Sequence, residues 1–212
     1  MGMSDISGYG QYKRDVFRKL NVEFVAGKSI LDIGCGDGTD AEIFIREFGL
    51  RTSAIDVYEH PRIQTIENLD FKIANILNLP FESGLFDYVF LHDVLHHVDE
   101  EEQSRERHLA GLREVKRVVA KTGTVVIVEA NRYNPISYFH MVKRHGHDHW
   151  KQSYFFQVVQ DVFQGVRFRT FEAHAYPWGY PMWRVYEYFM EQMAPSALRS
   201  YNVAIISPNE SS

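Results

Sequence analysis

Short apolar runs alternate with segments of helical period along this chain, and this alternation constrains its fold more than any other feature. The runs lie at residues 29–33, 52–57, 71–76, 88–91 and 124–128. Each has the length of a strand, and Gly, Asp, Asn or Pro lies near its ends. We therefore interpret the five runs as strands of one sheet.

Two sets of apolar residues between these runs recur at the spacing of one helical face: Ala41, Phe44, Ile45 and Phe48, and then Leu109, Leu112, Val115 and Val119. Asp99 and Glu102 are expected to cap the start of the second helix. Strands that alternate with helices are joined by right-handed crossovers and lie parallel. The pattern predicts an open α/β sheet.

The second half of the chain continues this pattern. The spacing predicts a helix over 154–163, a strand over 166–173, a last strand over 201–206 and a frayed tail over 207–212. The connection between the last two strands is far longer than a hairpin needs. It contains a predicted helix with five apolar residues on one face: Met182, Tyr186, Phe189, Met190 and Met193.

The composition fits a single domain. A chain of 212 residues with 45% hydrophobic and 24% charged residues can bury a full core. Cys35 is the only cysteine, which excludes an intramolecular disulfide and a zinc site of several thiolates. A formal charge of -5 gives no reason to expect a nucleic acid partner. We expect no membrane span and interpret the chain as soluble and cytoplasmic.

A glycine-rich segment, Leu-Asp-Ile-Gly-Cys-Gly-Asp-Gly, occupies residues 31–38 between the first predicted strand and the first predicted helix. Alternate glycines let the backbone turn sharply and approach a ligand closely, although a plain strand-to-helix turn is the alternative interpretation. A dinucleotide-binding fingerprint needs its third glycine at position 39, which is Thr39. The spacing D-x-G-x-G-x-G instead resembles motif I of the class I S-adenosylmethionine-dependent methyltransferases.

Three further motifs extend this resemblance over residues 29–129. Asp56 ends the second strand, where a carboxylate can accept hydrogen bonds from ribose hydroxyls. Asn75 stands where the family usually has an Asp that meets adenine, and its amide can still accept and donate hydrogen bonds there. Residues 86–92 resemble motif IV, and Val-Leu-His-His-Val at 94–98 is similar to a sequence common in small-molecule, "methyltransferase type 11"-like members.

The resemblance implies a Rossmann-like sheet of seven mostly parallel strands, with helices on both faces and an antiparallel last strand. It implies S-adenosyl-L-methionine as the cofactor and a cofactor site at ten residues: Asp32, Gly34, Cys35, Gly36, Gly38, Asp56, Val57, Asn75, Ile76 and His92. We divide the single domain, 1–212, into a helical segment over the cofactor site (1–28), a cofactor-binding core (29–129) and an acceptor-side region (130–200).

Ligands of an open α/β sheet lie beyond the carboxyl ends of its strands. His96 and His97 follow the fourth strand and are the catalytic candidates, since a histidine there can take a proton from an oxygen or nitrogen acceptor. Packing or capping is the alternative role for each. Asp93 and Glu129 lie at the same edge. The substrate-binding candidates are Tyr9, Asn131, Tyr133, His149, Trp150, Tyr176 and Trp178.

Two segments have several interpretations. The alternate histidines at 145–149 suit metal ligation, but a glycine-containing loop gives no sign of second-shell support, and we expect no metal. The aromatic segment 176–183 suits an acceptor pocket, a subunit interface or ordinary core. We interpret it as core and pocket wall, in a monomer or homodimer.

The sequence thus predicts a methyltransferase that acts on an oxygen or nitrogen of a small organic acceptor by in-line displacement. No Asn/Asp-Pro-Pro-Tyr/Phe signature follows the fourth strand, which argues against the enzymes that methylate amino groups of nucleic acids and glutamine. A nicotinamide- or nucleotide-sugar-binding oxidoreductase is disfavoured by the glycine spacing. A non-catalytic cofactor-binding subunit of a larger complex is the other alternative.

Overall fold

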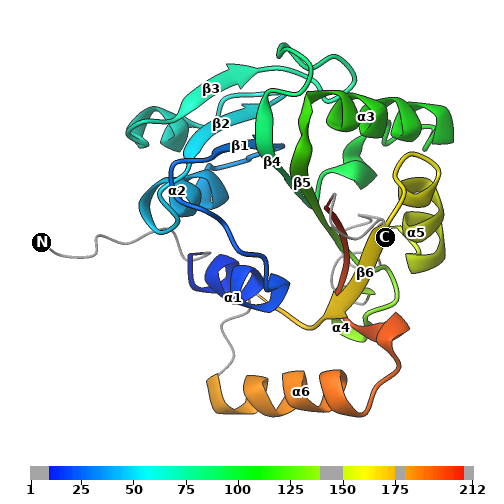
Figure 1. Cartoon of the computed structure of the whole chain (residues 1–212). Helices are drawn as coiled ribbons and strands as arrows, with labels where there is room; N and C mark the ends of the chain where they lie inside the picture. The colour runs from blue at the N-terminus through cyan, green and yellow to red at the C-terminus, as the bar shows by residue number, and fades with distance from the viewer. Residues whose placement is uncertain (1–9, 139–149, 175–179, 208–212) are drawn as a thin grey trace, which may run out of the picture.

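The sheet of this protein has seven strands in the order β3-β2-β1-β4-β5-β7-β6 (Figure 1). The computed structural model describes residues 10–138, 150–174 and 180–207. The strands are β1 Ser29–Ile33, β2 Arg51–Asp56, β3 Asp70–Ile73, β4 Phe86–His92, β5 Val119–Ala130, β6 Val166–Phe171 and β7 Tyr201–Ile206. The strands from β3 to β5 pair in parallel, and β7 lies antiparallel between β5 and β6. This confirms the predicted fold.

The helices cover both faces of this sheet. They are α1 Gly10–Leu20, α2 Thr39–Arg46, α3 Arg105–Val118, α4 Pro135–Ser137, α5 Gln152–Gln160 and α6 Tyr180–Gln192. Short 3-10 turns occupy η1 Pro61–Thr65, η2 Leu95–His97 and η4 Ser196–Leu198. No described helix is long and apolar enough to cross a membrane.

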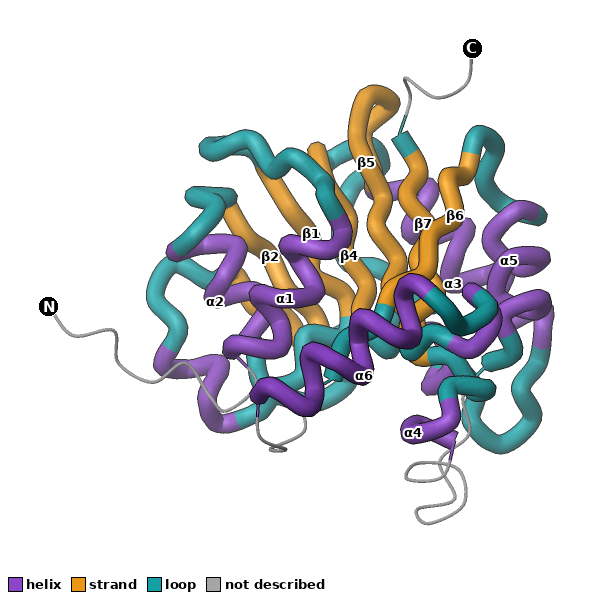
Figure 2. Tube along the Cα trace, turned by 90° about the horizontal axis from the view of Figure 1, so that it is seen from below, coloured by secondary structure: helices purple, strands orange, loops and turns teal. Residues whose placement is uncertain are grey.

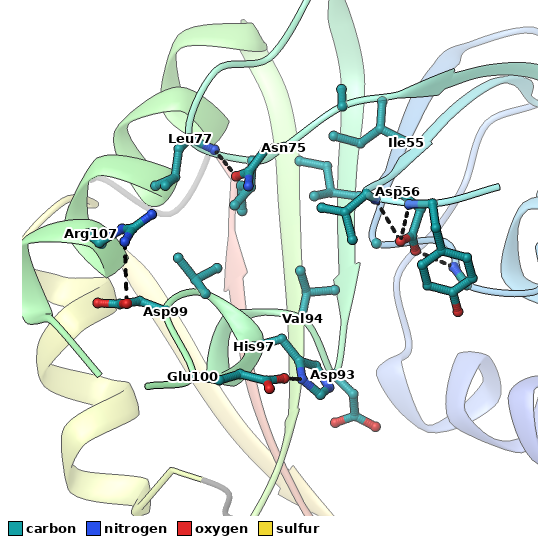
Figure 3. A pocket seen from close by; sticks show the side chains of 18 residues that line it. Ile55, Asp56, Asn75, Leu77, Asp93, Val94, His97, Asp99, Glu100 and Arg107 are labelled. Carbon is teal, nitrogen blue, oxygen red and sulfur yellow. Dashed lines mark hydrogen bonds and ion pairs between the residues drawn. The ribbon is translucent and has the colours of Figure 1, made fainter. Parts of the chain in front are cut away.

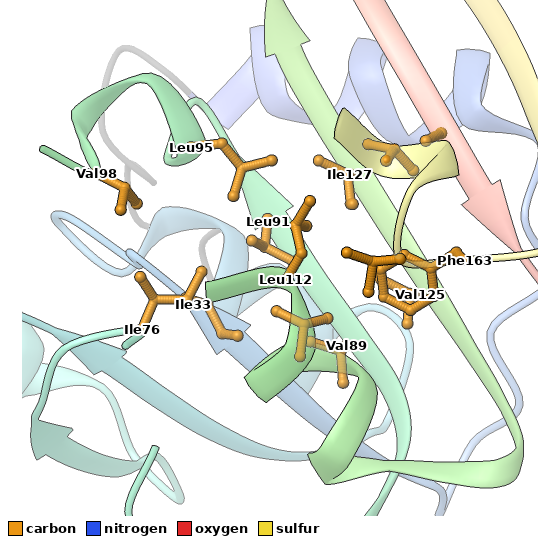
Figure 4. Packing of buried hydrophobic residues seen from close by; sticks show 14 of the residues in the cluster. Ile33, Ile76, Val89, Leu91, Leu95, Val98, Leu112, Val125, Ile127 and Phe163 are labelled. Atoms are coloured by element: carbon orange, nitrogen blue, oxygen red, sulfur yellow. The ribbon is translucent and has the colours of Figure 1, made fainter. Parts of the chain in front are cut away.

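Two apolar clusters lie against opposite faces of the sheet, because successive side chains of a strand point to opposite sides. Val89 and Leu91 of β4 pack with Leu112 of α3 and with α5 (Figure 4). Tyr88 and Phe90 of the same strand pack with α1 and α2. A central strand that is buried on both faces has a nearly continuous apolar sequence, which explains the run at 88–91.

The start of the third helix differs from its prediction. Helix α3 begins at Arg105, so Asp99 and Glu102 are not its capping pair. Asp99 instead adopts a left-handed backbone conformation, with φ of 67°, and its carboxylate accepts a hydrogen bond from the backbone N–H of Ser104 at 3.0 Å. The Asp99 carboxylate therefore closes a turn before the helix and does not cap the helix itself.

Helix α6 has the predicted position but not the predicted burial. Met182 and Met193 are each about 70% exposed, and only Met190 of the predicted apolar face is buried. The interpretation of segment 176–183 as core is therefore wrong for Met182. Helix α6 lies beside α1 and α4 at the end of the molecule where β5 finishes (Figures 1 and 2), and Lys19 of α1 forms an ion pair with its Glu191 at 2.8 Å.

Candidate functional site

The glycine-rich turn between β1 and α2 keeps three glycines in the left-handed region. Gly34, Gly36 and Gly38 have φ values of 69°, 54° and 77°. A Cβ on Gly34 would lie 2.6 Å from Val94, whereas a Cβ on Gly36 would meet no atom within 4 Å. Gly34 thus permits close packing of two loops, and Gly36 faces open space that a ligand can enter.

Asp56 joins the end of β2 to this turn. Its carboxylate accepts a hydrogen bond from the backbone N–H of Gly36 at 2.8 Å and another from that of Val57 at 2.7 Å. The side chain is largely buried. Two charge-assisted bonds to backbone donors therefore hold a carboxylate at a fixed position beside the open glycine.

A cavity of about 490 Å³ opens between this turn and the loops after β3 and β4 (Figure 3). Six of the ten predicted cofactor residues line it: Gly34, Gly36, Asp56, Val57, Asn75 and Ile76. Asn75 accepts a hydrogen bond from the backbone N–H of Leu77 at 2.9 Å, which fixes its amide in the wall. The cavity is within the size range of small-molecule and cofactor sites, roughly 300–1,000 Å³.

The loop after β4 contributes a mixed wall that the sequence only partly predicts. Asp93, Val94 and the catalytic candidate His97 line the cavity. Asp99 and Arg107 also line it and lie 3.4 Å apart (Figure 3). These last two were missed, since Asp99 was interpreted as a cap and Arg107 reaches the cavity only because of the turn before α3.

The two adjacent histidines have different surroundings. The ring of His97 is 44% exposed and forms a hydrogen bond with Glu100. The ring of His96 is 2% exposed, does not line the cavity, and its Nδ1 donates to Glu129 at 2.7 Å. Burial opposes a charge on His96, but the Glu129 carboxylate raises the pKa of His96 overall.

Asp93, His96 and Glu129 together have one possible ligand atom each within 4.8 Å of the others. However, the Glu129 carboxylate already accepts the backbone N–H groups of Val94 and Leu95 as well as His96 Nδ1. Asp93 accepts from the Ala130 N–H and the Tyr201 hydroxyl. All three side chains therefore already have hydrogen-bond partners within the protein, and we interpret the group as a hydrogen-bond network.

Comparisons with known proteins bear on this cavity. A family profile described as a methyltransferase domain matches residues 31–127. Norajmaline N-methyltransferase of Rauvolfia serpentina is 28% identical over 110 residues, which are 48% of this chain and 35% of that protein. Demethylmenaquinone methyltransferase of Oceanobacillus iheyensis is 27% identical over 139 residues, 60% of this chain and 54% of that protein. The chain thus spans about a third to a half of these curated relatives.

The profile covers the glycine turn, Asp56, Asn75 and the loop after β4, and all of them meet at the cavity. Residues 31–127 thus resemble a methyltransferase domain, and the sequence relatives support a likeness to the S-adenosylmethionine-dependent methyltransferases. A methyltransferase from Archaeoglobus fulgidus has the same fold, with a TM-score of 0.66, 18% identity and coverage of 95% of this chain and 94% of that one. N-methyltransferase NodS from Bradyrhizobium japonicum gives a TM-score of 0.61 at 17% identity, with coverage of 97% and 89%.

The residues of the cavity fit S-adenosylmethionine, the cofactor of the methyltransferases that this chain resembles. The open space at Gly36 admits a ligand against the backbone. Asp56 offers an acceptor for hydroxyl groups, and Asn75 offers an amide beside the apolar wall of Ile55 and Ile76. A ribose and a purine require an acceptor and an apolar wall of this kind.

Four predicted cofactor residues do not line the cavity: Asp32, Cys35, Gly38 and His92. Asp32 is fully buried behind the turn, and its Oδ2 has no hydrogen-bond partner among the described residues. Burial and then the Asp40 charge raise the pKa of Asp32 well above its usual range. Burial also raises the pKa of the Cys35 thiol, so the thiol stays protonated and unreactive.

His92 belongs to a buried polar cluster between β4, α1 and α2. Its Nδ1 lies 3.2 Å from Asp40 Oδ2 and 2.8 Å from Lys13 Nζ. Lys13 donates to Asp40 at 2.8 Å. The cluster joins the predicted N-terminal segment to the carboxyl edge of β4.

Three of the predicted substrate-binding residues are described by the structure, and none of these three lines the cavity. Asn131 is buried and donates to the carbonyls of Ala197 and Arg199. Trp150 is buried and donates to Gln103 at 3.0 Å. Tyr133 is 45% exposed. The other four, Tyr9, His149, Tyr176 and Trp178, lie outside the described residues, as does the histidine segment 145–149.

Proposed function

We propose that this chain is an S-adenosylmethionine-dependent methyltransferase that methylates an oxygen or nitrogen of a small organic acceptor. The observation that carries the proposal is the cavity in which the open Gly36 and the buried Asp56 carboxylate face the loop after β4. The activities named for two relatives, norajmaline N-methyltransferase and demethylmenaquinone methyltransferase, support a small organic acceptor.

The bound cofactor would supply a methyl group that its sulfonium charge has already activated. The protein then has to align the reactants and exclude water. Asp56 and Asn75 would hold the cofactor, and Val94 and Val98 supply apolar wall on the side of the β4 loop. A proton must leave the acceptor only when its oxygen or nitrogen begins protonated.

We propose His97 as the group that accepts such a proton. It lines the cavity, and its Nδ1 forms a hydrogen bond with the Glu100 carboxylate. A carboxylate only accepts, so Nδ1 carries the hydrogen and Nε2 carries the lone pair in the neutral ring. His96 does not line the cavity, and its Nδ1 is bound to Glu129. His97 is therefore the better candidate for the base.

The test is transfer of an isotope-labelled methyl group from the cofactor to a panel of amines, phenols and carboxylic acids. We expect labelled product with an amine or a phenol, and about a 100-fold lower kcat for His97→Ala with an acceptor that must lose a proton. The variant should keep the cofactor affinity of the parent. Gln11→Ala, at an exposed position of α1, is the control and should transfer at the parent rate.

Equal pH–rate profiles for the parent and His97→Ala would contradict the role of His97. Cofactor binding without transfer to any acceptor would favour the alternative of a non-catalytic subunit. No binding at all would contradict the proposed function.

A further inference from the structure

At the carboxyl ends of the neighbouring strands β4 and β5, a carboxylate on each side accepts hydrogen bonds from backbone N–H groups on the other side. The parallel ladder between them ends at His92 and Val128. Beyond it, Asp93 Oδ1 from the β4 side accepts the backbone N–H of Ala130 at 2.8 Å. Glu129 Oε1 from the β5 side accepts the backbone N–H groups of Val94 at 2.9 Å and Leu95 at 2.6 Å.

We infer that Glu129 is a positioning residue for the cofactor cavity, and that it fixes the loop after β4 through these two backbone bonds and through His96. The inference rests on the proposed function only for the identity of the ligand. Glu129 and His96 lie outside the cavity wall, so both act on a ligand through the loop that they hold.

Three features make this attachment strong. The Glu129 side chain is completely buried, so its hydrogen bonds are not in competition with water. Charge-assisted bonds are about twice as strong as neutral ones. His96 donates from Nδ1 to the other carboxylate oxygen at 2.7 Å, and its raised pKa favours the cation that balances the buried charge.

The groups around the His96 ring favour the same charge state. Asp93 and Glu100 raise its pKa further, and both come from the same loop. The His97 ring contacts the His96 ring with centroids 4.0 Å apart and the ring planes tilted by 39°. Gln103, in the turn before α3, adds a neutral amide that donates to the His96 backbone carbonyl at 3.1 Å.

The position of this loop sets the width of the cavity. Val94 packs so closely on the glycine turn that a Cβ on Gly34 would overlap it. Val94 and Gly34 both line the cavity, as does His97 three residues later (Figure 3). A bond that fixes the Val94 backbone therefore fixes the gap between the loop and the glycine turn.

The test compares the parent, Glu129→Gln and a control. Asp87→Asn is the matched control, because Asp87 also accepts a backbone N–H, that of Ser29 at 2.9 Å, but at the opposite edge of the sheet. Amide hydrogen exchange measures the attachment without any ligand. Titration calorimetry with S-adenosylhomocysteine measures its effect on the cavity.

In Glu129→Gln we expect exchange at Val94 and Leu95 to accelerate about tenfold, as a neutral amide replaces a carboxylate. Exchange at Ile127, within β5, should not change. We also expect S-adenosylhomocysteine to bind about tenfold more weakly to this variant and with unchanged affinity to Asp87→Asn. Glu129→Asp, which keeps the charge, should recover part of the affinity.

Parent-like exchange at Val94 and Leu95 in Glu129→Gln would overturn the attachment. Faster exchange with unchanged affinity would overturn the positioning role. A parent chain that gives no heat with S-adenosylhomocysteine contradicts the proposed function, and the exchange measurement still decides whether Glu129 fixes the loop.

Discussion

Gly34 shows how one residue shapes the cavity. Its φ of 69° suits glycine, and its missing Cβ leaves the space that Val94 fills. Asp32 shows the opposite case, because its buried carboxyl has one oxygen without a hydrogen-bond partner among the described residues and is costly to ionise. Both residues belong to the glycine-rich motif, but only Gly34 contacts the cavity.

Gly34→Ala should therefore destabilise the fold more than alanine at a glycine with free space. Gly27 is the matched control, because its φ is 80° and a Cβ there would meet no atom within 4 Å. We expect Gly27→Ala to lower the free energy of unfolding by about 1 kcal/mol, from the left-handed conformation alone. Gly34→Ala adds overpacking against the stiff Val94 and should lose about 2–4 kcal/mol. Urea titration of both variants measures the difference, and equal losses would refute the packing argument.

At the scale of elements, α1 is attached to the sheet by polar contacts as well as by its apolar face. Val16, Phe17 and Leu20 are buried against the sheet. Lys13 reaches Asp40 of α2, and Tyr12 forms a hydrogen bond with Tyr201 of β7. The two partners lie 27 and 189 residues away along the chain, so helix periodicity predicted the element but not its polar attachment.

The Lys13–Asp40 contact makes the stability of the fold pH-dependent. Burial opposes ionisation of Asp40, but Lys13 and then His92 lower its pKa from the usual 3.8 to about 2. A lowered pKa contributes stability above the unfolded-state value, and this contribution is lost as the pH falls toward about 2. Removal of the Lys13 charge should therefore lower the free energy of unfolding most near neutral pH.

We expect Lys13→Met to lower the free energy of unfolding by about 1–3 kcal/mol at pH 7, because it leaves a buried charge with less compensation. The difference from the parent should shrink at pH 3. Arg18→Met is the control on the same helix, since the Arg18 side chain is 70% exposed, and should change stability by less than about 0.5 kcal/mol. Denaturant titrations at both pH values measure this, and a difference that grows in acid would contradict the account.

Over the whole molecule, the predictable part of the structure is the part that depends on local pattern. Strands β1 and β7 have their predicted bounds, because turn residues border compact apolar runs. The glycine turn and Asp56 meet at the cavity, because parallel strands bring their carboxyl ends to one edge. The number of strands and the antiparallel last strand followed from the resemblance, whereas the strand order comes from the structure.

The side-chain partners could not be predicted in the same way. Trp150 is bound to Gln103 from 47 residues away, and Asn131 to carbonyls 66 and 68 residues away. Their aromatic and amide types suit a pocket and an interior equally well. The exposed methionines of α6 likewise recur at helical spacing, but this spacing does not show whether another part of the protein covers them.

The central claim is that the cavity beside Asp56 binds S-adenosylmethionine. Titration calorimetry of the parent and Asp56→Ala with S-adenosylhomocysteine tests it most directly. We predict one site per chain in the parent and at least about tenfold weaker binding in Asp56→Ala, since a buried carboxylate that accepts hydrogen bonds is lost. Absence of binding to the parent, or equal affinity for the two proteins, would contradict the claim.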